Sequence, residues 1–108
     1  MLVLERMTRA PMTITGERTV KEALSILAGH KKRHLPVLDE DENLVGIVSE
    51  KDHLRAQLAE TVDKVMTRNV ITVTEYTALE EAARTMADHK ISSLPVMRSG
   101  KLVGIVTE

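Results

Sequence analysis

The pattern of hydrophobic and polar positions divides the chain into two similar halves. Residues 44–50 (LVGIVSE) return as residues 102–108 (LVGIVTE), and six of the seven positions are identical. The tripeptide Leu-Pro-Val at residues 35–37 likewise returns at residues 94–96, an offset of 59 residues. A self-match that extends over about 40 residues is the signature of an internal repeat. We therefore predict that the chain is two copies of one structural unit.

Each half predicts a helix at the same place in its repeat. Apolar residues recur at helical spacing after Thr19 and again after Thr77. A glutamate stands three residues after each threonine, at Glu22 and Glu80, which is typical of a capping box. We expect the first helix to end near His30 and the second to occupy the equivalent residues of the other half.

Strands and short turns complete each half. Short β-rich runs come before the helices, and continuous apolar runs come after them, as expected for strands covered on both faces. We expect the apolar runs to pair around polar turns, and we expect a short helix or turn before each half. A further helix from about Lys51 to Glu60 would bury Leu54 and Leu58. The predicted strands are 12–15, 35–38, 45–48, 71–74, 94–97 and 102–106, and the short helices or turns are 2–7 and 62–66.

These elements predict an α/β fold of two tandem β-α-β-β-α repeats, at residues 1–60 and 61–108. One such unit of about 50 residues buries too little apolar surface to be stable alone. We therefore expect the repeats to pack through their sheets with pseudo-two-fold symmetry. The second repeat lacks its last helix, because the sequence stops at Glu108. We expect that the natural chain continues or that another surface covers the exposed strands.

Composition removes several classes of function. A net charge of -1 and a single aromatic residue, Tyr76, argue against a nucleic-acid or anionic-membrane partner. The absence of cysteine excludes disulfides, thiolate metal sites and a cysteine nucleophile. The sequence contains no signal-peptide core and no membrane-spanning apolar run. From these two absences we expect a cytoplasmic protein. The sequence also offers no nucleophile–base pair, metal cluster or glycine-rich phosphate loop, so we expect that the protein is not an enzyme.

The order and duplication of these motifs resemble a CBS-domain pair, also called a Bateman module. The matching features are Val-Met-Thr at residues 65–67, the Leu-Pro-Val and Leu-Val-Gly-Ile-Val strands, and Ser-Glu-Lys-Asp at residues 49–52. The resemblance implies a regulatory module that binds AMP, ADP, ATP or S-adenosylmethionine in clefts between the repeats. It further implies a homodimer that controls an attached or associated enzyme or transporter, without an obligatory cofactor. The alternative function is a structural dimerisation module with vestigial clefts.

Ser49 and Asp52 carry the chemistry expected of a ribose site. A hydroxyl at a strand end and a carboxylate three residues later can both face one ligand, and an aspartate accepts hydrogen bonds from a ribose diol. Local sequence alone equally fits an N-cap serine followed by a first-turn acid. The resemblance implies two sites: one joins Ser49 and Asp52 to Val70, Ile71, Thr72, Ser92 and Ser93, and the other joins Thr107 to Pro11, Met12, Thr13, Arg33 and His34. The aspartate of the second site would follow Glu108.

Two polar stretches can each be interpreted in two ways. The basic run at residues 31–34 can bind phosphate through Arg33 or His34, or can be a solvated helix end that favours the helix dipole. The acidic stretch from Asp39 to Asn43 has the spacing of a calcium loop, but the position that requires glycine is Leu44. We therefore predict a hairpin turn there, and no metal site.

Overall fold

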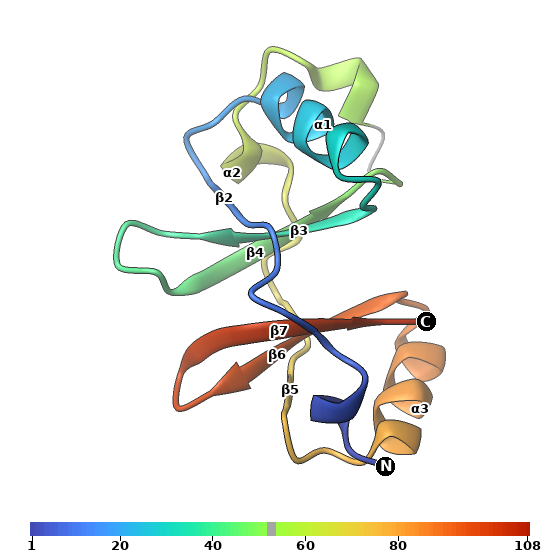
Figure 1. The fold of residues 1–108 in the computed structure, drawn as a ribbon. Coiled ribbons are helices and arrows are strands. Elements are labelled where there is room, and N and C mark those ends of the chain that lie inside the picture. Colours follow the sequence, from blue (N-terminus) through green and yellow to red (C-terminus); the bar gives the residue numbers. More distant parts are fainter. Residues whose placement is uncertain (52–53) are drawn as a thin grey trace. The chain divides into compact units, whose positions relative to one another are not determined.

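The computed structural model describes residues 1–51 and 54–108, and over these residues it is a mixed α/β structure with two sheets (Figure 1). None of the described helices has the length and apolar character needed to cross a membrane. In chain order the elements are η1 (Val3–Glu5), β1 (Thr8–Arg9), β2 (Ile14–Thr15), α1 (Val20–Gly29), β3 (His34–Leu38), β4 (Leu44–Ser49), η2 (Leu54–Gln57), α2 (Val62–Val65), β5 (Val73–Thr74), α3 (Leu79–His89), β6 (Ser93–Arg98) and β7 (Lys101–Thr107), where η denotes a 3-10 helix.

The chain forms two compact units, and its first eleven residues pack with the second repeat. The first-repeat unit is Met12–Asn69, and the second-repeat unit combines Met1–Pro11 with Val70–Glu108. Strand β1, which the sequence did not predict, pairs antiparallel with β7. The backbone N–H of Val3 also donates to the carbonyl of Thr77 at 2.9 Å. The compact units therefore do not coincide with the sequence repeats.

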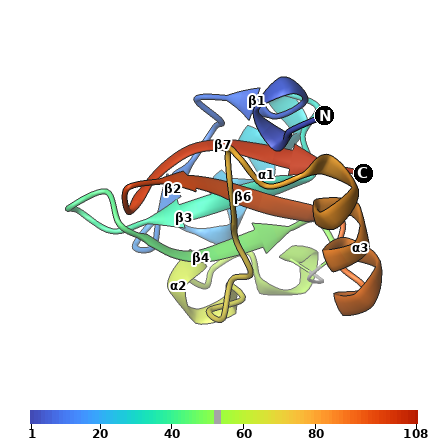
Figure 2. The same cartoon turned by 90° about the horizontal axis from the view of Figure 1, so that it is seen from below.

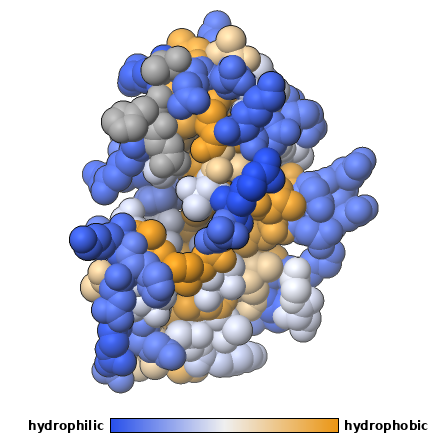
Figure 3. Space-filling view, turned by 180° about the vertical axis from the view of Figure 1, so that it is seen from behind, coloured by the Kyte–Doolittle hydropathy of each residue, from blue (hydrophilic) through white to orange (hydrophobic). Residues whose placement is uncertain are grey.

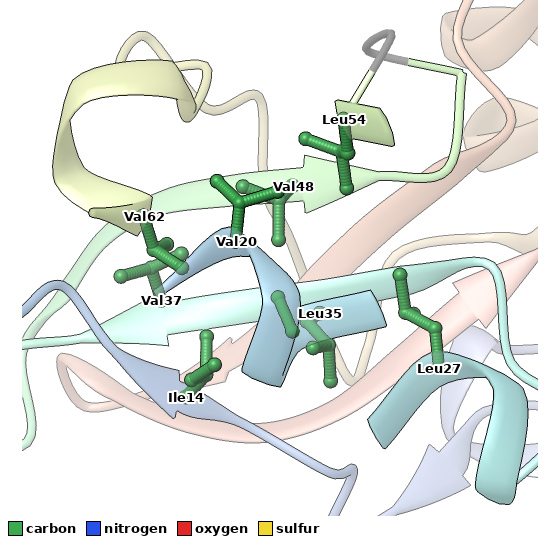
Figure 4. Close-up of a cluster of buried hydrophobic side chains, with 9 residues drawn as sticks. Ile14, Val20, Leu27, Leu35, Val37, Val48, Leu54 and Val62 are labelled. Atoms are coloured by element: carbon green, nitrogen blue, oxygen red, sulfur yellow. The ribbon is translucent and has the colours of Figure 1, made fainter. Parts of the chain in front are cut away.

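The first-repeat unit is built on a three-stranded sheet in the order β2-β3-β4. Strand β2 is parallel to β3, and β3 is antiparallel to β4. Helices α1 and α2 and the 3-10 helix η2 cover one face of this sheet (Figures 1 and 2). Their apolar side chains meet those of the strands (Figure 4). The buried cluster is Ile14, Val20, Ala23, Leu27, Leu35, Val37, Val48, Leu54 and Val62.

The second-repeat unit is built on a four-stranded sheet in the order β1-β7-β6-β5. Strands β5 and β6 are parallel, and β6 and β7 form an antiparallel hairpin. This unit has a hydrophobic cluster of its own, to which η1, α3 and the strands contribute. Its buried members are Val3, Met7, Ala82, Met86, Leu94, Val96 and Val106.

The glycine of each repeated heptad meets the same methionine contact in its own unit. A Cβ on Gly46 would stand 2.8 Å from Cγ of Met66 and 3.0 Å from the carbonyl oxygen of Thr67. A Cβ on Gly104 would stand 2.7 Å from Sδ of Met7 and 2.9 Å from the carbonyl oxygen of Thr8. The heptad therefore needs glycine because a neighbouring backbone segment lies too close to the strand to leave room for a side chain. This segment is Met66–Thr67 in one unit and Met7–Thr8 in the other.

The structure confirms one of the two predicted helix caps. Helix α1 begins after Thr19, whose Oγ1 accepts from the N–H of Glu22 at 3.2 Å while the carboxylate of Glu22 accepts from the N–H of Thr19. The cap predicted at Thr77 is wrong, because α3 begins after Ala78 without a side-chain cap. The hydroxyl of Thr77 instead accepts from the N–H of Thr74 at 3.1 Å.

A tertiary contact satisfies the first N–H of α3. The N–H of Leu79, at the start of the helix, donates to the carbonyl of Met1 at 2.9 Å. One of the N–H groups that a helix start leaves without an intrahelical partner is thus satisfied by the N-terminal segment.

The helix predicted from Lys51 to Glu60 is also wrong over the described residues. They contain only η2, followed by a turn. Leu54 is buried as predicted, but the side chain of Leu58 is 43% exposed. The carbonyls of Leu58 and Glu60 accept from the N–H groups of the first two residues of α1, at 3.2 and 2.9 Å. Because these carbonyls satisfy the start of α1, they do not continue a helix of their own.

Candidate functional site

The end of the β3–β4 hairpin gathers three of the predicted site residues. Ser49 lies opposite His34 in the strand register, and both are half-buried. The next residue along, Glu50, donates its N–H to the carbonyl of Arg33 at 3.1 Å. The hydroxyl of Ser49 accepts from the N–H of Lys51 at 3.3 Å, a contact within the turn that follows β4. The predicted ribose carboxylate, Asp52, lies outside the described residues.

The second-repeat unit repeats this arrangement at the end of its own hairpin. Thr107 lies opposite Ser93, and Glu108 donates its N–H to the carbonyl of Ser92 at 3.2 Å. Ser93 is buried at 7% exposure, whereas Thr107 is exposed. In both units, the residue at the end of the last strand of the hairpin therefore faces the residues that precede the Leu-Pro-Val strand.

The other predicted residues lie at the entries to β2 and β5. Ile71 is partly buried against the hydrophobic cluster of the second-repeat unit, so its side chain contributes to that core. Met12, before β2, is 39% exposed and is free of that constraint. Of the remaining three, Val70 and Thr13 are half-buried and Thr72 is exposed. Pro11 is half-buried at the end of the N-terminal segment.

Each predicted site draws on both units. Within one unit, the structure places residues of both predicted sites side by side. Ser49, assigned to one site, is the strand neighbour of His34, assigned to the other. Thr107 and Ser93 are neighbours in the same way. Within each unit, residues assigned to the two expected sites are therefore cross-strand neighbours.

The acidic hairpin turn is held by its own aspartate. The carboxylate of Asp39 accepts from the backbone N–H groups of Asp41 and Asn43, at 2.9 and 2.8 Å, and from the side-chain amide of Asn43 at 3.2 Å. Such an arrangement stabilises a turn, and it confirms the predicted hairpin. Among the described residues, no group of three or more histidines or carboxylates is placed to hold a metal ion.

Sequence reasoning missed an ion pair between a buried glutamate and an exposed arginine in the second-repeat unit. Glu75 is only 4% exposed, and Arg98 donates to its two carboxylate oxygens at 2.6 and 2.5 Å. These hydrogen bonds hold the pKa of Glu75 below its ordinary value and raise that of Arg98. The parallel register of Thr74 with Met97 brings Glu75 and Arg98 together, and no local pattern in the sequence indicates this register. The backbone hydrogen bond from Thr19 lowers the pKa of Glu22 in the same way.

The repeated fold agrees with a comparison to protein families. The CBS domain model matches residues 3–58 and again residues 62–108. The chain belongs to the CBS domain family, as a tandem pair. The expected family and α/β fold class are therefore confirmed.

Curated relatives of this CBS pair are longer proteins with enzyme names. The chain is 38% identical over 109 residues to L-aspartate semialdehyde sulfurtransferase of Methanocaldococcus jannaschii, and 34% identical over 108 residues to homoserine O-acetyltransferase of Methanosphaera stadtmanae. It is 35% identical over 101 residues to inosine-5'-monophosphate dehydrogenase of Staphylococcus aureus. These alignments cover 98%, 97% and 90% of this chain but only 21%, 22% and 21% of the relatives. The chain thus spans about a fifth of each relative.

Solved CBS pairs with bound adenosine compounds share this fold. The CBS domain pair of protein MJ0100, in complex with 5'-methylthioadenosine and S-adenosyl-L-methionine, superposes with a TM-score of 0.93 at 37% identity, covering 99% of this chain and 89% of that one. CBSX2 in complex with AMP gives a TM-score of 0.89 at 32% identity, covering 99% and 90%. Pairs similar to this chain therefore bind adenosine-containing ligands.

Proposed function

We propose that this CBS pair is a regulatory module that binds an adenosine-containing ligand and controls a partner protein or a fused domain. The observation that carries the proposal is the likeness to the CBS pair that binds 5'-methylthioadenosine and S-adenosyl-L-methionine, which covers almost the whole chain. The likeness to an AMP-bound pair supports the same ligand class. AMP, ADP and ATP are the first candidates, followed by S-adenosylmethionine.

Each proposed site combines polar and apolar groups suited to a nucleotide. Ser49 and Asp52 would hold the ribose of one ligand, with Val70, Ile71 and Thr72 beside the base and Ser92 and Ser93 at the phosphate. Thr107 would act in the other site, with Pro11, Met12 and Thr13 beside the base and Arg33 and His34 at the phosphate. Local geometry supports the hydroxyl positions, since Ser49 and Thr107 end equivalent strands.

Binding would regulate by favouring one conformation of the pair over another. A ligand shifts such an equilibrium by no more than its difference in affinity for the two states. The module itself would perform no reaction. The enzyme names of the longer relatives fit a CBS pair attached to a catalytic domain. We propose a cytoplasmic homodimer as the setting in which this change is transmitted.

Calorimetric titration with AMP, ADP, ATP and S-adenosylmethionine tests the ligand proposal. We expect at least one compound to bind the wild type and to bind Asp52→Asn about tenfold or more weakly, a loss of about 1.4 kcal/mol. Asp88→Asn, an exposed aspartate of α3, is the matched control and should bind normally. Equal weakening by the two variants would exclude Asp52 as a ligand contact.

The second candidate function is a structural dimerisation module with vestigial sites. It predicts no heat with any of the four compounds and a melting temperature that depends on protein concentration alone. That pair of results would replace the ligand proposal.

A further inference from the structure

The start of the chain belongs to the second-repeat unit, although the chain continues from there into the first-repeat unit. Residues 1–11 pack with residues 70–108, whereas Met12 already belongs to the other unit. The chain therefore passes from one unit to the other at Ala10 and Pro11, directly after β1. We call Met1–Arg9 the N-terminal arm, and we call Ala10 and Pro11 the hinge.

Backbone hydrogen bonds attach the N-terminal arm to the second-repeat unit near both of its ends. Near its start, the N–H groups of Val3 and Leu4 donate to the carbonyls of Thr77 and Glu75, at 2.9 and 3.0 Å. At its other end, β1 pairs antiparallel with β7. The arm is drawn in dark blue in Figure 1. Each of these bonds forms equally well with the N-terminal arm of another copy of the chain.

The N-terminal arm also covers an apolar surface. Val3 is fully buried and Met7 is 9% exposed, and both belong to the hydrophobic cluster of the second-repeat unit. Apolar side chains already reach the molecular surface between hydrophilic ones (Figure 3), and an arm that merely opened would add to them. Because exposing this cluster to water is unfavourable, the surface requires an arm, either its own or that of a second copy.

The hinge holds Ala10 in a conformation that alanine avoids. Its φ is 45°, in the left-handed region, where the Cβ of an L-residue crowds the backbone. The proline that follows restricts Ala10 further, toward extended values. The N–H of Ala10 donates to the carbonyl of Val103 at 3.3 Å, and its side chain is exposed. A long hydrogen bond thus holds a strained residue that loses no burial when it extends.

The second repeat makes the equivalent connection without this strain. Residues 61–69 pack with the first-repeat unit, and Val70 begins the other unit. Asn69 corresponds to Ala10 at the repeat offset of 59 residues, and it does not have a positive φ although asparagine tolerates one better than alanine. The other described non-glycine residues with positive φ follow helices or lie in hairpin turns, and they are Lys31, Lys90, Glu42 and Ser99. The strain at Ala10 is therefore a property of the hinge and not a requirement of the fold.

We propose that two copies of this chain exchange their N-terminal arms, so that the arm of each copy packs on residues 70–108 of the other. The exchange keeps the contacts of the arm and lets the hinge extend, which removes the strain in both copies. Short hinges under strain favour such an exchange, and the loss of free movement of two copies opposes it. The inference rests on the homodimer proposed above and specifies how its copies are joined, but it does not rest on the adenosine ligand.

Cysteine cross-linking tests the exchange, because the chain contains no cysteine of its own. Leu2 and Ala78 form an antiparallel bridge, so cysteines at these positions lie within disulfide reach. One chain carries Leu2→Cys and another carries Ala78→Cys, and the two are unfolded, mixed, refolded at about 0.1 mM and oxidised. We expect a covalent dimer in which mass spectrometry finds the link between positions 2 and 78. Leu58→Cys, at an exposed position of the first-repeat unit, replaces Ala78→Cys in the matched control, which should stay mostly unlinked.

Substitutions in the hinge test the cause of the exchange. Ala10→Gly accepts a positive φ without strain, so the dissociation constant of the dimer, measured by sedimentation, should rise about tenfold or more. Ala10→Pro fixes φ at about −65°, which excludes the closed hinge and should raise the cross-linked fraction. Asn69→Gly, at the equivalent unstrained position, is the matched control and should behave like the wild type.

Two outcomes would overturn the proposal. In the first, Leu2→Cys and Ala78→Cys on the same chain form an intrachain disulfide, while the mixed single variants link no more than the Leu58→Cys control. The intrachain disulfide would show that the two positions meet and oxidise, so each arm would have stayed on its own chain. The second is an equal dissociation constant for the wild type and Ala10→Gly, which would exclude hinge strain as the cause. A homodimer that forms without the cross-chain link would contradict the exchange and leave the proposed function standing, so the two proposals fail separately.

Discussion

The two repeats share the contacts that hold their strands and differ at helix starts and hairpin ends. In both units a methionine and a backbone carbonyl cover the glycine of the repeated heptad, at Gly46 and at Gly104. In both, the backbone N–H of the last heptad residue donates to the carbonyl two positions before the Leu-Pro-Val segment. Glu50 donates to Arg33 in one unit, and Glu108 donates to Ser92 in the other. These shared contacts identify what the fold requires of the sequence.

The differences show where each repeat is free to change. The first repeat has Gly16 and Asp39 where the second has the ion pair of Glu75 and Arg98. Asp39 organises its own turn instead of pairing across the sheet. Since the fold tolerates either solution, a charge found in only one repeat is not imposed by the architecture.

The largest expected effect tests the shared contact. Gly46→Ala and Gly104→Ala should each destabilise the protein by about 1–3 kcal/mol, because the added methyl meets a backbone carbonyl as well as methionine. Urea denaturation measures the change in the free energy of unfolding. The two variants should cost similar amounts, since the carbonyl lies at 3.0 Å in one and 2.9 Å in the other.

Gly29→Ala is the control for the glycine substitutions. No atom lies within 4 Å of a Cβ built at this helical position, so alanine should stabilise α1 by about 0.5–1 kcal/mol. If Gly46→Ala were also stabilising, the added methyl would not meet the methionine and the carbonyl, and the close contact would not be the reason for glycine in the heptad.

The ion pair of Glu75 and Arg98 sharpens the comparison through pH. The folded pKa of Glu75 lies below its ordinary 4.5, so its charge stabilises the fold above that pH, and this contribution is lost as pH falls through the folded pKa. Glu75→Gln should therefore lower the melting temperature at about pH 7, with a smaller difference from the wild type at about pH 3. Glu22 adds acid sensitivity to both proteins and leaves the difference unaffected.

Glu40→Gln, at an exposed position of the first repeat's hairpin turn, is the control for this titration. Its melting temperature should follow that of the wild type across the same pH range. A constant deficit of Glu75→Gln from neutral to acid pH would show that packing, and not charge, accounts for the loss.

Short-range patterns predicted most of the fold. The apolar runs, the helical spacing after Thr19 and the two hairpin turns all depend on neighbours in sequence, and each was found where it was expected. Strand β1 was missed because nothing in residues 8–9 indicates that they pair with β7, almost 100 residues later. The cap at Thr77 failed because α3 begins one residue later, after Ala78, and the hydroxyl of Thr77 accepts from Thr74 instead.

The candidate site was likewise predictable only where it depends on neighbours in the sequence. The neighbourhood of Ser49 and His34 follows from the hairpin register, which the short turn held by Asp39 helps to fix. The contact of residues 58–60 with the start of α1 does not follow from any local pattern, and the sequence predicted a longer helix there.

The smallest expected effects come from substitutions that exchange the capping residues at the starts of α1 and α3. Thr19→Ala should cost about 1 kcal/mol, because α1 loses the hydroxyl that accepts from Glu22. Ala78→Ser should add a cap to α3 and stabilise it by a similar amount, because Met1 accepts from Leu79 whereas a capping hydroxyl accepts from one of the next two N–H groups. Urea denaturation of both variants gives the two free energies. Helix α1 already combines the two kinds of partner, since Glu60 accepts from the N–H of Val20 while Thr19 accepts from that of Glu22. If Ala78→Ser gained nothing, the contact with Met1 would be sufficient for the start of α3, and the different caps of the two helices would have no energetic consequence.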